Sequence, residues 1–199
     1  MRDVLNLLRP LVLGLAAAVY CAGAALSETL SIQDRITQCA GCHGADGNSP
    51  LPNIPSLAGQ PAFFVLNQLF LMREGVRKIE AMAPFVKDLK DSDLDALSAY
   101  FAKLPAKASN EPADPALVKR GAEIATQKKC VSCHKPNLAG DQQVPRIAKQ
   151  RIDYLSKTLK EYRDSKREGA DTLMSGAVAG LSDADLVALA HFAAAADRK

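Results

Sequence analysis

The motif Cys-x-x-Cys-His occurs twice in this chain of 199 residues, and this repetition limits the possible folds and chemistry most strongly. The first copy occupies residues 39–43 and the second residues 130–134. The chain holds 5 Cys and 3 His. Only Cys21 and His191 therefore remain for any other Cys or His chemistry.

The sequence after each motif repeats as well. Residues 55–60, PSLAGQ, match residues 145–150, PRIAKQ, and residues 89–97 match 181–189. The second copy carries a small insertion around residues 167–171. An internal repeat of this length is one supersecondary unit used twice. The Pro-containing segment 104–116 is typical of a linker. We expect an N-terminal domain over residues 25–108 and a C-terminal domain over residues 109–199.

Both units are expected to be helical, because apolar residues recur at three- and four-residue spacing and no alternating strand pattern is present. Asp91, Ser92 or Asp93, and in the second unit Ser182, stand where helix N-caps belong. Each unit is small for a self-supporting core, so something must help it fold. The fold class is predicted as all-α, with helices over residues 61–73, 91–103, 116–129, 151–165 and 183–196.

The first residues have the pattern of an export signal. Arg2 and Arg9 precede an apolar run over residues 11–20, and small residues follow this run. We expect a signal peptide over residues 1–24, cleaved near Ala24. The apolar run is short for a bilayer span. A retained membrane anchor and lipid attachment at Cys21 are the alternatives.

The two motifs predict two covalently bound haem c groups. On an N-terminal helix turn, two Cys three residues apart project to the same side and can each form a thioether to one haem vinyl group. The following His then points its imidazole at the iron. A zinc ribbon needs more closely spaced Cys pairs, and a disulfide does not explain the His. The predicted haem-binding residues are Cys39, Cys42 and His43 in the first unit, and Cys130, Cys133 and His134 in the second.

Met82 and Met174 are the candidate distal ligands of the two irons. They follow the two motif His residues at nearly equal spacing, and both are expected in less regular stretches before the last helix of their unit. A thioether ligand favours Fe(II) and raises the reduction potential relative to a second His. His191 is an alternative ligand, although its place in the last helix favours packing. The predicted metal ligands are His43, Met82, His134 and Met174.

With these residues in place, the chain resembles the cytochrome c4 family, in which one exported chain holds two class I cytochrome c domains. The resemblance covers essentially all of the mature chain and is most specific over residues 39–49, 55–60 and 82–84. It implies a periplasmic electron-transfer protein without enzyme activity, which often passes electrons to a terminal oxidase in the membrane. It also implies that the carbonyls of Pro55 and Pro145 accept hydrogen bonds from the proximal imidazoles.

The chain departs from the family pattern at several positions. In the second copy, Lys135-Pro136-Asn137 follows the motif in place of a Gly and a second Gly after it, and Lys149 replaces the Gly of the loop. Leu30 stands in the first copy where the second has Gly121. The helix before Cys39 is therefore expected to be short or packed differently.

The charge balance bears on partners. A formal net charge of +3 is too weak to argue for nucleic acid. We expect redox proteins such as a membrane cytochrome complex or terminal oxidase as partners, and peripheral membrane contact is compatible with that role. The alternatives are a cytochrome subunit of a periplasmic dehydrogenase, or a dihaem peroxidase or gas-binding protein with one open haem. A basic run is either a solvated helix face or a docking patch for an acidic partner; it comprises Lys157, Lys160, Arg163, Lys166 and Arg167.

Overall fold

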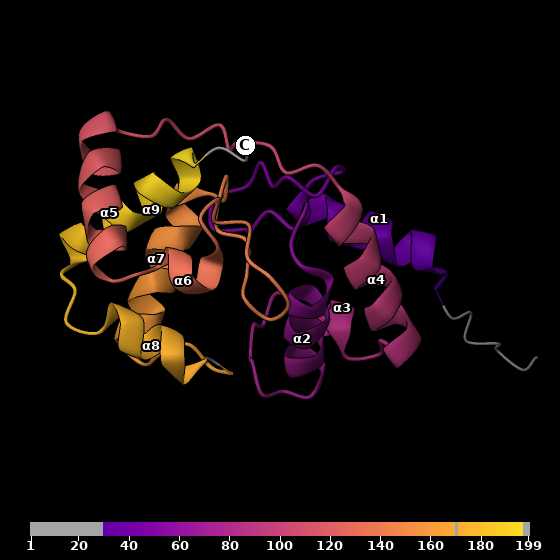
Figure 1. The fold of residues 1–199 in the computed structure, drawn as a ribbon. Coiled ribbons are helices and arrows are strands. Elements are labelled where there is room, and N and C mark those ends of the chain that lie inside the picture. The colour runs from indigo at the N-terminus through magenta and orange to yellow at the C-terminus, as the bar shows by residue number, and fades with distance from the viewer. Residues whose placement is uncertain (1–29, 170, 197–199) are drawn as a thin grey trace, which may run out of the picture.

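The computed structural model describes residues 30–169 and 171–196, and these residues form helices joined by loops (Figure 1). Outside the helices they contain one isolated β-bridge, between Asp141 and Val144. The expected signal peptide over residues 1–24 lies outside the described residues. Among the residues described, no single helix is long and apolar enough to cross a bilayer, and the helices Thr172–Val178 and Asp183–Ala195 meet that criterion only as a pair bent by 113°.

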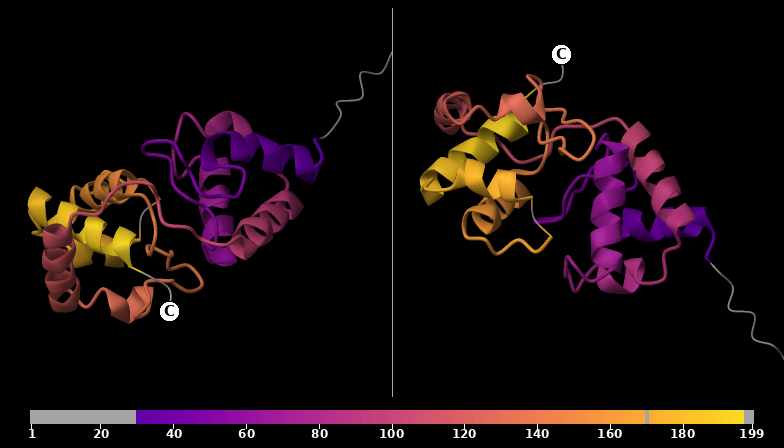
Figure 2. Two further views of the ribbon diagram at one scale, coloured as in Figure 1. Left: turned by 90° about the horizontal axis from the view of Figure 1, so that it is seen from above. Right: turned by 60° about the horizontal axis from the view of Figure 1, so that its bottom comes forward.

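Two helical units lie side by side, joined by the extended segment that follows residue 103 (Figure 1). Both views in Figure 2 also show two distinct helical units. The N-terminal unit contains α1 (Ile32–His43), α2 (Ala62–Arg73), α3 (Ala83–Val86) and α4 (Asp91–Lys103). The C-terminal unit contains α5 (Pro115–Gln127), α6 (Val131–His134), α7 (Ile152–Arg163), α8 (Thr172–Val178) and α9 (Asp183–Ala195). The predicted all-α fold with two domains is confirmed.

The five helices predicted from periodicity are present as α2, α4, α5, α7 and α9, with ends within about two residues of those expected. Ser182 is the N-cap of α9, as predicted. The predicted cap of α4 is wrong: Lys90 is the N-cap and α4 begins at Asp91. The reason is that the Asp93 carboxylate accepts from the Lys90 N–H at 2.9 Å, which places Asp93 at the third helical position.

The core of each unit forms where its long helices pack together. In the N-terminal unit Val65 of α2 packs with Leu97 and Phe101 of α4. In the C-terminal unit α5 and α9 approach closely at Gly121, where a Cβ would lie 2.1 Å from the Ala188 carbonyl oxygen. Gly121 therefore permits a helix contact that no larger residue allows.

The first unit lacks this close helix contact at the corresponding position. Leu30 precedes α1, which begins only at Ile32, and Leu30 is 45% exposed. The stretch of helix before Cys39 is accordingly shorter than the one that α5 provides before Cys130. This agrees with the expectation drawn from the missing glycine.

Candidate haem sites

The first motif lies at the end of α1, the first helix described in its unit. Cys39 is half-buried against the N-terminal core, and Cys42 is exposed. Burial raises the pKa of the Cys39 thiol. His43 is the last residue of α1 and is 7% exposed. The helix therefore presents both thiols and the imidazole within its final turns.

A backbone carbonyl fixes the orientation of the His43 ring. Nδ1 of His43 lies 2.8 Å from the carbonyl oxygen of Pro55. Because a carbonyl oxygen only accepts, Nδ1 carries the proton and Nε2 keeps its lone pair. Burial lowers the pKa of His43, although the Pro55 contact opposes this effect. The side chain is thus a neutral imidazole with one nitrogen available to a metal.

The second motif repeats this geometry on a separate short helix. Cys130 is the N-cap of α6, and Cys133 and His134 lie within α6. Nδ1 of His134 lies 2.9 Å from the carbonyl oxygen of Pro145. Burial again lowers the pKa of the imidazole. The contacts implied for Pro55 and Pro145 are therefore both present.

The two candidate methionines are half-buried in their own units. Met82 is the N-cap of α3 and packs against the same cluster as Cys39. Met174 packs against the same cluster as Cys130. The expected irregular stretch is wrong for Met174, which lies inside α8. The helix starts before it because Asp171 accepts from the Leu173 N–H at 2.8 Å and caps α8.

These donors fit a c-type haem better than the alternatives. The four motif cysteines form no disulfide with one another, and they belong to two different units. In the described part of the chain, no three or more His, Cys, Asp or Glu side chains gather as a metal site. Nδ1 of His191 accepts from the Asp114 N–H at 3.1 Å, so His191 ties the linker to α9. Thiols, a neutral imidazole and a thioether in each unit form the donor set that a covalent haem requires.

The second unit keeps the loop conformation of the first without its glycines. Gly44, Gly47 and Gly59 have φ of +87°, +74° and +64°. Their equivalents also have positive φ: +69° at Lys135, +53° at Leu138 and +57° at Lys149. Gly47 and Leu138 each accept two N–H groups of the loop that carries the proline. The departures from the family pattern therefore leave the architecture of the second site intact.

Comparisons with known proteins identify the family. Residues 118–195 match the family model described as cytochrome c, and residues 33–101 match cytochrome C oxidase, cbb3-type, subunit III. The chain is 35% identical to the cytochrome c4 of Stutzerimonas stutzeri, over 92% of this chain and 93% of that protein. The chain belongs to the cytochrome c4 family.

A solved structure agrees with this membership, and a second group of relatives carries a different name. The crystal structure of reduced recombinant cytochrome c4 from Pseudomonas stutzeri matches with a TM-score of 0.75 and 31% identity, over 85% of this chain and 100% of that one. A protein of Thiomonas intermedia named thiosulfate dehydrogenase electron acceptor is 28% identical over 98% of this chain and 94% of its own length. This cytochrome c4 family member carries two covalently bound haem c groups and is an electron-transfer c-type cytochrome that works with redox partners.

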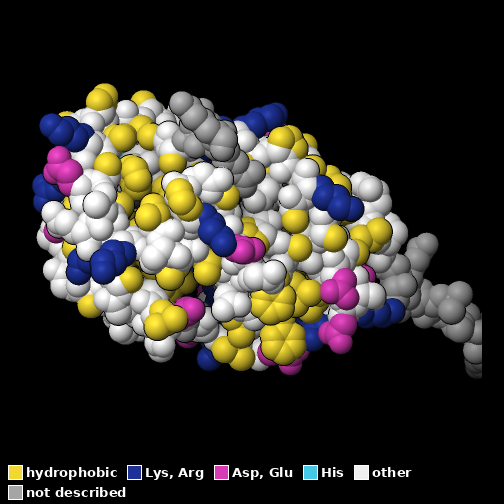
Figure 3. Space-filling view, viewed as in Figure 1, with side chains coloured by type: hydrophobic (Ala, Val, Ile, Leu, Met, Phe, Trp, Pro, Cys, Tyr) yellow, Lys and Arg dark blue, Asp and Glu magenta, His cyan; other side chains and the backbone are white. Residues whose placement is uncertain are grey.

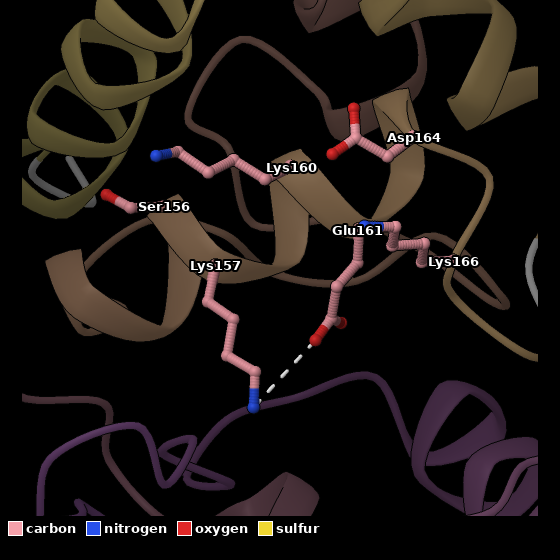
Figure 4. A pocket seen from close by; sticks show the side chains of 6 residues that line it. All are labelled: Ser156, Lys157, Lys160, Glu161, Asp164 and Lys166. Carbon is pink, nitrogen blue, oxygen red and sulfur yellow. Dashed lines mark ion pairs between the residues drawn. The ribbon is translucent and has the colours of Figure 1, made fainter.

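The predicted basic run is largely a set of ion pairs. Glu161 pairs with Lys157 at 3.8 Å, and Asp183 pairs with Lys160 and Arg163 at 2.8 and 2.6 Å. Figure 4 shows Lys157 reaching toward Glu161 beside a shallow pocket of about 430 Å³ on α7. This pocket is lined by Ser156, Lys157, Lys160, Glu161, Asp164 and Lys166, so it contains none of the candidate haem-binding residues.

Arg167 fits neither a solvated helix face nor a docking patch. Its side chain is 7% exposed, pairs with Glu161 at 3.3 Å and lies with its guanidinium carbon 5.1 Å from the centre of the Tyr162 ring.

The N-terminal unit exposes several large hydrophobic side chains, among them Phe63, Phe70 and Phe85. Figure 3 shows hydrophobic side chains gathered over the region of α2. Exposed apolar surface of this kind is a general feature of protein interaction sites.

Proposed function

We propose that this protein is a periplasmic carrier of single electrons, with no substrate chemistry of its own, that delivers electrons to a terminal oxidase or another respiratory partner. One observation carries the proposal. In each unit a Cys of the motif and the candidate Met pack against the same core cluster, while the motif His is buried and oriented. Each unit therefore offers both a proximal and a distal ligand, which favours two six-coordinate irons without a substrate site.

Each unit supplies its own complete set of proposed haem ligands. Bound haem supplies a one-electron Fe(III)/Fe(II) couple. The imidazoles bind through Nε2, because Nδ1 donates to a proline carbonyl. The thioethers favour the reduced state. We assign Cys39, Cys42, His43 and Met82 to the domain over residues 25–108, and Cys130, Cys133, His134 and Met174 to the domain over residues 109–199.

We further propose export to the periplasm, with a signal peptide over residues 1–24 cleaved near Ala24. The charged start, the apolar run and the small residues support this assignment. Covalent haem attachment needs reduced thiols, and four of the 5 Cys of the chain belong to the two motifs. Mass spectrometry of the mature holoprotein tests both points, since cleavage and two haems change the mass by known amounts.

The proposed delivery of electrons is tested with reduced holoprotein and membranes that contain a terminal oxidase. We expect oxidation of both haems, followed in the α-band, and inhibition by an oxidase inhibitor. Met82→Ala and Met174→Ala should each open one iron to carbon monoxide. Met72→Ala should not, because Met72, although it packs against the same cluster as Met82, corresponds in the repeat to Tyr162 and not to a Met. Oxidase-independent turnover of peroxide by the unaltered protein would contradict the carrier role.

A second candidate is the electron acceptor of a periplasmic dehydrogenase. Two relatives carry the name thiosulfate dehydrogenase electron acceptor, at 28% and 31% identity over 98% and 81% of this chain. A dehydrogenase of that class, mixed with its substrate and this protein, would then reduce both haems at a rate that depends on dehydrogenase concentration. Reduction by the dehydrogenase without oxidation by membranes would favour this second candidate over the first.

A further inference from the structure

The two units meet through a reciprocal pair of glutamines. Gln60 donates from Nε2 to the Arg146 carbonyl at 2.9 Å and accepts at Oε1 from the Arg146 N–H at 3.0 Å. Gln150 makes the same two contacts with Ser56, at 2.9 and 2.8 Å. Gln60 and Gln150 occupy the same place in the repeat. All four residues are at most 4% exposed, so water does not compete for these hydrogen bonds.

Each glutamine contacts the very peptide group that holds the proximal histidine of the other unit. The Pro55 carbonyl and the Ser56 N–H belong to one planar peptide. That carbonyl accepts from His43, and that N–H donates to Gln150. A single peptide thus links the His43 ring of the N-terminal unit to a side chain of the C-terminal unit.

The Pro145–Arg146 peptide repeats the arrangement in the opposite direction. Its carbonyl accepts from His134 and its N–H donates to Gln60. The link therefore crosses between the units twice. Neither glutamine acts on the histidine of its own unit by this route.

We propose that Gln60 and Gln150 are positioning residues that tune the iron of the opposite unit. A hydrogen bond at the N–H end polarises a peptide and makes its carbonyl a stronger acceptor. A stronger acceptor at Nδ1 makes the imidazole a more basic ligand, which stabilises Fe(III). Loss of one glutamine therefore raises the reduction potential of the haem in the other unit. The inference rests on the proposed ligation of iron by His43 and His134.

Other contacts between the units provide a matched control. The Asn53 N–H donates to Asp153 at 2.9 Å, and the Lys78 N–H donates to Glu168 at 2.9 Å. Both contacts cross the interface, but neither involves the Pro55–Ser56 or Pro145–Arg146 peptide. Glu168→Ala therefore weakens the interface without touching the proposed link. Asp153 is not used as a control, because it pairs with Arg151, whose N–H donates to Gln150.

The test is a redox titration of the full holoprotein in which NMR of the haem methyl groups resolves each haem. For Gln60→Leu we expect the C-terminal haem to be reduced with an equilibrium constant about threefold larger, which is about 28 mV at 59 mV per tenfold. The N-terminal haem should keep its value. Gln150→Leu should give the mirror result, and the Nδ1–H resonance of the opposite His should move upfield. Glu168→Ala should shift neither haem selectively.

A second pair of variants keeps the test decisive if the Leu variants lose haem. Gln60→Glu and Gln150→Glu retain an acceptor for the N–H and add negative charge beside it, so each should lower the potential of the opposite haem. A shift confined to the haem of the same unit, equal shifts of both haems, or no shift in either series would overturn the proposal. A crossed shift in a protein that membranes fail to oxidise would refute the proposed electron delivery and leave this inference standing.

Discussion

Lys149 in the C-terminal unit and Gly59 in the N-terminal unit hold the same left-handed backbone conformation, with φ of +57° and +64°. Each N–H donates to a carbonyl of the last helix of its unit, at Ala193 for Lys149 and at Phe101 for Gly59. This hydrogen bond ties the loop that carries the proline and glutamine to the helical core. The C-terminal unit maintains the tie with a residue that disfavours the conformation.

Lys149→Gly should therefore stabilise the C-terminal unit. A side chain in the left-handed region costs about 1 kcal/mol, which a glycine avoids. Urea unfolding of the holoprotein should show that unit gaining about 0.5–1 kcal/mol. Lys149→Ala is the control, since it removes the long side chain but keeps the Cβ, and it should give no gain. Equal stabilisation by both substitutions would refute backbone strain as the cause.

Gly121→Ala should destabilise the C-terminal unit by about 1–3 kcal/mol. The new Cβ would lie 2.1 Å from the Ala188 carbonyl oxygen, so α5 and α9 must move apart. Gly176→Ala in α8 is the matched control, because a Cβ there has no neighbour within 4 Å. It should be neutral or stabilising, since Ala favours helix. Denaturant midpoints of the two variants measure the difference, and equal midpoints would count against the close helix contact.

Asp185 should make the C-terminal unit sensitive to acid. Hydrogen bonds from Ser182 and then from Arg120 lower the pKa of Asp185 to about 2, below the value of about 3.9 in an unfolded chain. Its stabilising effect is therefore complete above about pH 4 and is lost as the pH falls through about 2. Thermal melting of Asp185→Asn should lack this component of the pH dependence. Parallel melting curves for the variant and the unaltered protein between pH 5 and 2 would contradict the assignment.

Removal of one haem should unfold its own unit. Each unit is small, and the motif Cys and the candidate Met pack directly against its core. The double variant Cys39→Ala with Cys42→Ala should therefore lose the protection of the α2 and α4 amides against hydrogen exchange. The protection of α5 and α9 should largely remain. Cys130→Ala with Cys133→Ala should give the reverse pattern, and full protection of both units in either double variant would be inconsistent with haem as part of the core.

Much of the site was predictable because local chemistry determines it. The spacing within each Cys-x-x-Cys-His motif places its three side chains together on any helical turn, and this holds both at the end of α1 and on α6. The long helices followed from apolar periodicity. The sequence pattern missed α3 and α8 because four- and seven-residue helices leave too little periodicity to detect.

The interface between the units was not predictable from the repeat. The matching of Gln60 with Gln150 marks an equivalent position but does not reveal that each side chain contacts the other unit. That contact depends on how two folded units dock, and no local pattern encodes docking. The burial of Arg167 was missed for a different reason: a cation in a basic run is normally solvated, yet this one packs against Tyr162 of its own unit.

The most direct test of the carrier role is the visible spectrum of the mature holoprotein, oxidised and reduced, with and without carbon monoxide. We expect two low-spin haems, a far-red band from Met coordination in the oxidised protein, and no response to carbon monoxide. Both irons would then have His and Met as ligands and no open coordination position, as expected for electron transfer without substrate chemistry. A high-spin haem, or rapid binding of carbon monoxide to one haem, would contradict the carrier role and favour a peroxidase or gas-binding function. Met174 would then be the first proposed ligand in doubt.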